Sequence, residues 1–294
     1  MPTKPANKPV PAEFGAGLKI GRYAFTHGET PKRRLTLDTY QPAKVDSADS
    51  PLPILVMYFG GGWLNGRPGH FTPLAQAIAH RGYVTVVPEY RLSGEARFPA
   101  AAHDCKAAVR WARKNANMLD GDPDRIAVTG GSAGGHLAGF VAATNGDQRF
   151  EGQGDHLEVN STVQAAIVMC GPMDFDVERV EKGIAASKEA GETNPYVAFF
   201  GATPTENPTI YHEASPLTHL SETMPPSLFI DGEYDQPKAR YTAFWEKMDS
   251  LGIAHEFVLM KEGPHPFWNF EAWFDQTVDA IDNFLNRHLT TDRN

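Results

Sequence analysis

The chain has 294 residues, of which 41% are hydrophobic and 21% charged, and this composition is ordinary for a globular protein that buries a large core. A net charge of −9 without a basic stripe argues against a nucleic-acid partner. No apolar run approaches the roughly 18 residues that a membrane-spanning helix needs.

Residues 1–17 are polar and rich in Pro, Lys and Ala, and we predict a disordered arm there without the hydrophobic region of a signal peptide. A cytoplasmic chain and a secreted chain whose signal was removed both fit this start. Residues 18–294 are expected to form a single domain. Within it, residues 171–226 are aromatic, rich in proline and only weakly periodic, and we predict an irregular, cap-like insertion.

Strand and helix patterns alternate along the rest of the chain. Continuous apolar runs indicate strands buried on both faces of a parallel sheet, and apolar residues at steps of three and four indicate amphipathic helices. Strands are expected at residues 34–40, 54–59, 83–87, 125–129, 163–169, 227–231 and 255–260, and helices at 71–81, 99–112, 133–140, 237–251 and 270–284. This alternation predicts an α/β fold, with a mostly parallel central sheet covered by helices on both faces.

A glycine-rich corner follows the predicted strand at residues 125–129 and leads into an apolar helix. Ser132 lies on this corner between Gly130 and Gly134, in the pattern G-x-S-x-G. At such a sharp turn the hydroxyl is exposed, the flanking residues must be nearly free of side chains, and the first amides of the helix face developing negative charge. Ser132 is therefore the candidate nucleophile, with Ala133 supplying one amide. A plain turn with a serine N-cap is the alternative.

Acyl transfer by a serine also needs donors for the oxyanion, a base and a group that orients the base. In open α/β sheets these parts gather at the carboxyl ends of the strands. Residues 60–62 are three glycines that follow the strand at 54–59. Without side chains, the amides of Gly61 and Gly62 are candidate oxyanion donors together with that of Ala133.

The base and its orienting acid are expected after the last two strands. His265, between two prolines, is the candidate base, because imidazoles ordinarily titrate near neutral pH. Asp235 is the first choice for the acid, with Asp231 and Glu233 as nearby rivals. Another histidine, His136, is expected to pack within the helix that follows Ser132.

With these residues in this order, the sequence resembles the α/β-hydrolase superfamily. Within that superfamily it resembles the feruloyl-esterase-like (BD-FAE-like) and hormone-sensitive-lipase-like esterases. The order Ser132, Asp235, His265 is the one expected of that fold. The resemblance runs from about residue 34 to 289 and includes further short motifs: Glu89–Leu92, Phe98–Ala100, Asp124–Ile126, Gly171–Pro172 with Asp174, and Ser215–Leu217. It implies Ser132 as nucleophile, Asp235 as acid and His265 as base, with the oxyanion donors named above.

The chain departs from the family pattern at two places. Phe59 precedes the glycine triplet, where the family often has a histidine that is thought to anchor the loop. This departure puts the support of the loop in question. In the acid loop, Gln236, Pro237 and Lys238 follow Asp235, where the family more often has apolar residues before a proline.

Six aromatic side chains are candidates for the wall of a substrate pocket, since such a wall suits sugars or aryl groups: Trp63, Tyr196, Phe199, Phe200, Phe267 and Trp268. The expected substrate is a small-molecule or carbohydrate ester with a short acyl chain (acetyl) or an aryl group, including acetyl or feruloyl esters of plant polysaccharides. A serine peptidase or amidase of the same fold and a non-catalytic hydrolase-like binding protein are the alternatives.

No metal or other cofactor is expected. Asp120, Asp122 and Asp124 lack a histidine at ligand spacing and indicate a solvated turn. Cys105 and Cys170 are expected to be small buried residues rather than a disulfide. The sequence leaves the oligomeric state open.

Overall fold

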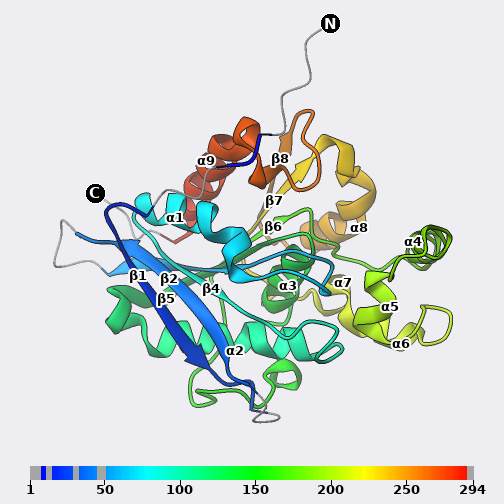
Figure 1. Cartoon of the computed structure of the whole chain (residues 1–294), viewed down its shortest axis with the longest axis horizontal. Coiled ribbons are helices and arrows are strands. Elements are labelled where there is room, and N and C mark those ends of the chain that lie inside the picture. The colour runs from blue at the N-terminus through cyan, green and yellow to red at the C-terminus, as the bar shows by residue number, and fades with distance from the viewer. Residues whose placement is uncertain (1–7, 11–14, 29–32, 45–50, 290–294) are drawn as a thin grey trace, which may run out of the picture.

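An eight-stranded, mostly parallel sheet forms the centre of the molecule (Figure 1). The computed structural model describes residues 8–10, 15–28, 33–44 and 51–289. The strands are β1 (Leu18–Phe25), β2 (Leu35–Pro42), β3 (Leu52–Tyr58), β4 (Val84–Pro88), β5 (Gly121–Gly131), β6 (Ala165–Met169), β7 (Ser227–Gly232) and β8 (His255–Met260). Their order across the sheet is β1-β2-β4-β3-β5-β6-β7-β8, and β2 pairs antiparallel with both of its neighbours.

The central strands are the continuous apolar runs of the sequence. All residues of β3, β4, β6 and β7 are buried, because helices cover both faces of the sheet. The seven strands predicted from the sequence are all present. The eighth, β1, was not predicted, because this strand at the edge of the sheet leaves most of its side chains partly or fully exposed and shows no apolar run.

Helices form the outer layers. They are α1 (Thr72–His80), α2 (Ala100–Lys114), α3 (Ala133–Ala143), α4 (Val177–Ala190), α5 (Pro195–Phe200), α6 (Pro208–Ala214), α7 (Pro216–His219), α8 (Pro237–Ser250) and α9 (Glu271–His288). Helices α1 and α9 contact each other on one side of the sheet, and α2 and α3 pack together on the other (Figure 1). The fold class predicted from the sequence is confirmed.

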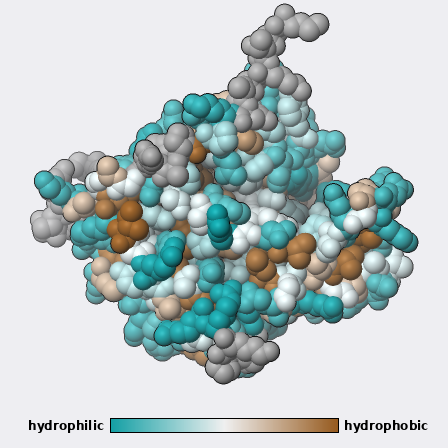
Figure 2. All heavy atoms as spheres, in the orientation of Figure 1, coloured by the Kyte–Doolittle hydropathy of each residue, from teal (hydrophilic) through white to brown (hydrophobic). Residues whose placement is uncertain are grey.

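The insertion at residues 171–226 contains helices α4 to α7 with irregular segments between them, so the prediction of an irregular segment was wrong in part. Helices α4 to α6 lie together at one side of the molecule (Figure 1). Helices α5, α6 and α7 have only 6, 7 and 4 residues and each begins at a proline, so they are too short to show a helical period in the sequence. Figure 2 shows hydrophobic residues gathered on the surface near this side of the molecule.

Part of the predicted disordered arm is paired with the rest of the chain. Pro9 forms a β-bridge with Phe270, and the amide of Val10 donates to the carbonyl of Asn269 at 3.0 Å. The prediction is therefore wrong for residues 8–10. Residues 1–7 and 11–14 lie outside the described residues.

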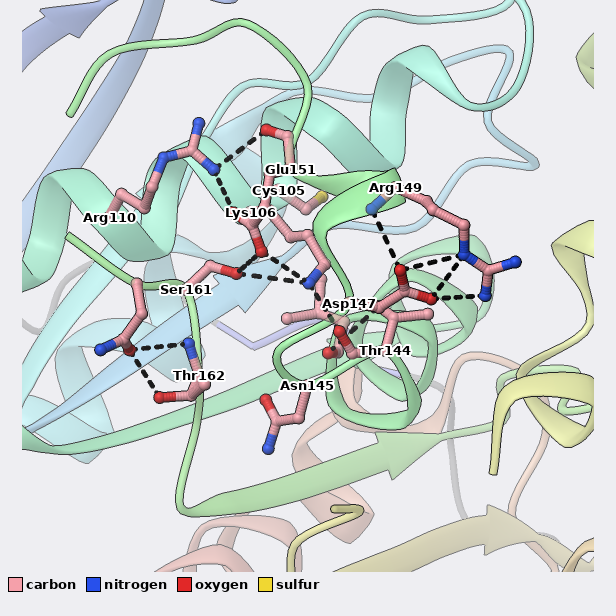
Figure 3. A network of polar contacts seen from close by, with 12 residues as sticks. Cys105, Lys106, Arg110, Thr144, Asn145, Asp147, Arg149, Glu151, Ser161 and Thr162 are labelled. Atoms are coloured by element: carbon pink, nitrogen blue, oxygen red, sulfur yellow. Dashed lines mark hydrogen bonds and ion pairs between the residues drawn. The ribbon is translucent and has the colours of Figure 1, made fainter. Parts of the chain in front are cut away.

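A buried polar network ties α2 to the segment that follows α3 (Figure 3). Lys106 is fully buried, and its ammonium donates to the carboxylate of Glu151 at 3.1 Å and to the carbonyl of Thr144 at 2.8 Å. The same carboxylate accepts from Arg110 at 2.5 Å and from Ser161 at 2.6 Å. Burial lowers the pKa of Lys106; it raises that of Glu151, but the adjacent cations more than offset this and lower the pKa overall.

Replacement of Glu151 by alanine is expected to lower the free energy of unfolding by about 3–5 kcal/mol, because Lys106 and Arg110 would remain buried without their counter-charge. Urea denaturation followed by circular dichroism measures this change. Glu158→Ala is the matched control, since its exposed ion pair with Lys114 contributes at most about 1 kcal/mol. An equal loss in both variants would contradict the assignment of the network as a stabilising element.

Candidate active site

Ser132 lies at the turn between β5 and α3, with a strained backbone of φ 57° and ψ −119°. The turn is possible only because the flanking residues are glycines. A Cβ atom at Gly130 would lie 2.2 Å from the carbonyl oxygen of Gly134, and one at Gly134 would lie 2.0 Å from that of Tyr58. The G-x-S-x-G pattern therefore has the geometric cause proposed from the sequence.

Three loops at the carboxyl ends of β5, β7 and β8 bring Ser132, Asp235 and His265 together. The Nε2 atom of His265 lies 3.0 Å from the Ser132 hydroxyl, and its Nδ1 atom lies 2.8 Å from the Asp235 carboxylate. The two rival acids lie elsewhere. Glu233 accepts a hydrogen bond from the amide of Glu262, and the buried Asp231 accepts one from the thiol of Cys170.

Arg240, on α8, stabilises the acid loop and was not predicted from the sequence. Its guanidinium lies 3.7 Å from the Asp235 carboxylate and 3.6 Å from that of Asp231, and it donates to the carbonyl of Cys170. Burial by itself raises the pKa of Asp235, but the hydrogen bond from His265 and the nearby positive charge of Arg240 lower it to about 2. Asp235 is therefore ionised throughout the physiological range of pH.

The candidate oxyanion donors line the cavities at Ser132. Ala133 is the first residue of α3, so its amide has no acceptor within the helix. Gly61 and Gly62 have φ angles of 130° and 61°, which a residue with a side chain rarely adopts. Gly62 lines a cavity together with Ser132 and Ala133, and both glycines line a second cavity with Ser132.

Tyr90 supports the loop where the family often has a histidine. The side chain of Phe59 is buried and stacks on the Tyr90 ring, with 4.3 Å between ring centroids. The Tyr90 hydroxyl donates to the carbonyl of Phe59 at 2.7 Å. The departure at Phe59 is thus accompanied by a second aromatic residue that holds the start of the loop in place.

Two cavities of about 370 Å³ each meet at Ser132, Gly62 and His265. Of the predicted aromatic wall, Trp63 and Tyr196 line the first cavity and Trp268 lines the second. Phe199, Phe200 and Phe267 line neither cavity and pack within the core. The prediction of Phe200 as a pocket residue was therefore wrong. The first cavity also has wall residues that were not predicted: Cys170, Pro172, Arg179, Pro195, Gln236, Ala239 and Arg240.

The acidic turn that was considered as a metal site is engaged in other contacts. Asp120 accepts hydrogen bonds from Lys19 and Gln41, and Asp122 accepts one from Arg125. Both cysteines are buried free thiols, as predicted. Within the described part of the chain, one group has donor atoms close enough together to hold a metal, namely Cys170, Asp235 and His265, whose donor atoms lie within 4.8 Å of one another.

The sequence profile of the BD-FAE family matches residues 37–242, which is more than half of the chain. The chain belongs to the BD-FAE family. The resemblance stated from the motifs is confirmed, and the sheet and its helical layers are those of the α/β-hydrolase fold.

Curated relatives of this BD-FAE family member have names of ester hydrolases. A probable carboxylic ester hydrolase of Mycobacterium tuberculosis, LipM, is 35% identical over 79% of this chain and 54% of its own length. The esterase LipQ of the same organism is 30% identical over 79% of this chain and 55% of its own length. The chain thus spans about half the length of these relatives.

Solved structures share the same architecture. Esterase 2 of Thermogutta terrifontis, in a propionate-bound form, has a TM-score of 0.73 and 26% identity over 95% of this chain and 98% of its own. A carbohydrate esterase from gut microbiota has a TM-score of 0.71 and 23% identity over 91% of this chain and 96% of its own, which shows the common fold. No helix in the described ranges of the BD-FAE chain is long and apolar enough to cross a membrane.

Proposed function

We propose that this chain is a serine esterase that hydrolyses short-chain acyl (acetyl) or aryl esters through an acyl-enzyme. The observation that carries the proposal is the continuous chain of hydrogen bonds from Ser132 through His265 to Asp235. Membership of the BD-FAE family and the esterase names of the relatives support it.

The geometry suggests a role for each group. The Ser132 hydroxyl attacks the ester carbonyl carbon while Nε2 of His265 takes its proton, and Asp235 holds the Nδ1–H of the ring. The amides of Gly61, Gly62 and Ala133 stabilise the oxyanion. His265 then gives the proton to the leaving alcohol, and a water molecule, activated by the same ring, releases the acid and restores the serine.

We assign the two halves of the ester to the two cavities that meet at Ser132. Volumes of about 370 Å³ are near the lower end of ordinary ligand sites and favour small acyl and alcohol groups. Aromatic walls formed by Tyr196 and Trp268 favour an aryl group or a sugar ring. Acetyl and feruloyl esters of plant polysaccharides are therefore included in the proposed substrate class.

A panel of p-nitrophenyl esters of graded chain length, methyl ferulate and acetylated xylan tests this function. We expect the highest kcat/KM on acetyl to butyryl esters and a decline with longer chains. Activity on a peptide substrate without ester hydrolysis would favour a peptidase, and no turnover of any substrate would favour a binding protein.

The rate is expected to fall as the pH drops below about 6, because histidines are ordinarily protonated there and a protonated His265 cannot accept the serine proton. Since the pKa of Asp235 is about 2, this carboxylate remains charged from pH 4 to pH 8 and does not itself cause the decline. Measurement of kcat/KM from pH 4 to pH 8 checks this. A rate that stays constant down to pH 4 would rule out His265 as the base.

A further inference from the structure

Three consecutive residues of the glycine loop have a left-handed backbone. The φ angles are 130° at Gly61, 61° at Gly62 and 56° at Trp63. Glycines adopt such angles without strain, but a tryptophan does so only where its surroundings hold it. Gly62, whose amide is a proposed donor, is followed directly by the strained residue Trp63. The contacts that hold Trp63 therefore also influence the direction of the Gly62 amide.

Trp63 is held at both its backbone and its side chain. Its carbonyl oxygen accepts hydrogen bonds from the amide of Ser93 at 2.8 Å and from the Ser93 hydroxyl at 2.9 Å. The indole is 3% exposed and stacks on Phe199, with 4.7 Å between ring centroids. The indole Nε1–H donates to Nδ1 of His136 at 3.2 Å.

His136 lies one turn after Ser132 on α3 and is fully buried. Its Nε2 atom lies 2.8 Å from the carbonyl oxygen of Ala214, the last residue of α6. That carbonyl can only accept, and the Trp63 indole can only donate. The ring must therefore be neutral, with its proton on Nε2 and its lone pair on Nδ1, and burial accordingly lowers its pKa to about 4.

We propose that His136 is a positioning residue for the oxyanion loop: by accepting the hydrogen bond from Trp63 it fixes the peptide of Gly62 so that its amide faces the Ser132 hydroxyl. His136 thereby connects the helix that follows the nucleophile to the loop that contains the donors. Through its hydrogen bond to the carbonyl of Ala214, it also connects both to the end of α6. This inference rests on the proposed esterase function of the site.

Four variants separate this role from a merely structural one. Trp63→Phe keeps a ring on Phe199 and removes the donor, and Trp111→Phe is the matched control at a buried tryptophan of α2 that lines neither cavity. His136→Asn places an amide oxygen where the ring has Nδ1. His136→Gln can reach the carbonyl of Ala214 with its amide nitrogen, but it then has no acceptor atom where the ring has Nδ1.

Trp63→Phe and His136→Gln are expected to lower kcat for p-nitrophenyl acetate by about 10- to 100-fold with little change in KM, since a misdirected oxyanion donor affects mainly the transition state. His136→Asn and Trp111→Phe are expected to stay within about threefold of the unchanged protein, because they leave the donor's direction intact. A Trp63→Phe enzyme with the kcat of the Trp111→Phe control, or one that changes only KM, would overturn the inference.

Hydrogen exchange of the peptide that contains residues 60–65 provides a readout that needs no activity. Faster exchange in Trp63→Phe and His136→Gln than in Trp111→Phe is expected, and equal exchange in all three overturns the inference. If the unchanged protein hydrolyses no ester, the proposed function fails, while the exchange experiment still decides whether His136 holds the loop. If His136→Gln does not fold, Trp63→Phe alone decides it.

Discussion

Replacement of Ser132 by alanine is expected to lower kcat for p-nitrophenyl acetate by about 10⁴- to 10⁶-fold. In the proposed mechanism, the substitution removes the atom that attacks the carbonyl and leaves His265 without the proton that it takes. Any remaining rate would come from oxyanion stabilisation and binding alone. Steady-state hydrolysis measured on purified protein, with circular dichroism to verify folding, gives the ratio.

An exposed serine provides the control for this experiment. Ser221→Ala removes a hydroxyl that bonds only to Thr223 among the described residues and is expected to leave kcat unchanged. A fluorophosphonate probe followed by mass spectrometry should label Ser132 in the unchanged protein and in Ser221→Ala. Labelling of another serine, or full activity in Ser132→Ala, would remove Ser132 as the nucleophile.

Replacement of Asp235 by asparagine is expected to lower kcat by about 10⁴-fold. The carboxylate accepts the Nδ1–H of His265, and in that tautomer Nε2 has the lone pair that faces Ser132. An asparagine can offer its NH₂ group to Nδ1 instead, which favours the tautomer with Nε2 protonated and unable to act as a base. The ratio of kcat values is measured at pH 8, above the range in which imidazoles are ordinarily protonated, so that the tautomer effect is separated from protonation of the base.

Glu233→Gln is the matched control, because Glu233 is on the same loop and its carboxylate bonds to the amide of Glu262 rather than to His265. We expect a change of less than about threefold, since a glutamine can still accept that hydrogen bond. If Glu233→Gln reduces the rate by orders of magnitude and Asp235→Asn does not, the acid has been wrongly assigned.

The sheet could be predicted because burial on both faces leaves a plain signal in the sequence. Residues 54–59 are apolar without interruption, and the same pattern identifies the other central strands. The structure differs where this signal is weak. Strand β1 is largely exposed and therefore has no apolar run. Helices α5 to α7 have no more than about two turns, which is too short to show a helical repeat of apolar residues. The pairing of Pro9 with Phe270 joins residues far apart in the chain, which no local pattern indicates.

The central site could be predicted because Ser132, Asp235 and His265 each follow a strand, and parallel strands place their carboxyl ends at one edge. The walls could not be predicted to the same degree. Phe200, which packs in the core, and Tyr196, which lines a cavity, are both aromatic residues of the same segment, so the sequence does not distinguish them. Only the packing of α5 does. Arg240 contacts the acid loop because of where α8 packs, and its place in the helix gives no sign of that contact.

The two hollows that share Ser132 have separate outer walls, and this separation has an evolutionary consequence. Pro172 and Tyr196, in the insertion, border one hollow, whereas Phe71 and Trp268, from other parts of the chain, border the other. These outer residues each line one hollow and not the other. Under the proposed function, preferences for the acid and for the alcohol of an ester substrate can therefore diverge independently among descendants of this protein, and a laboratory selection for one need not sacrifice the other.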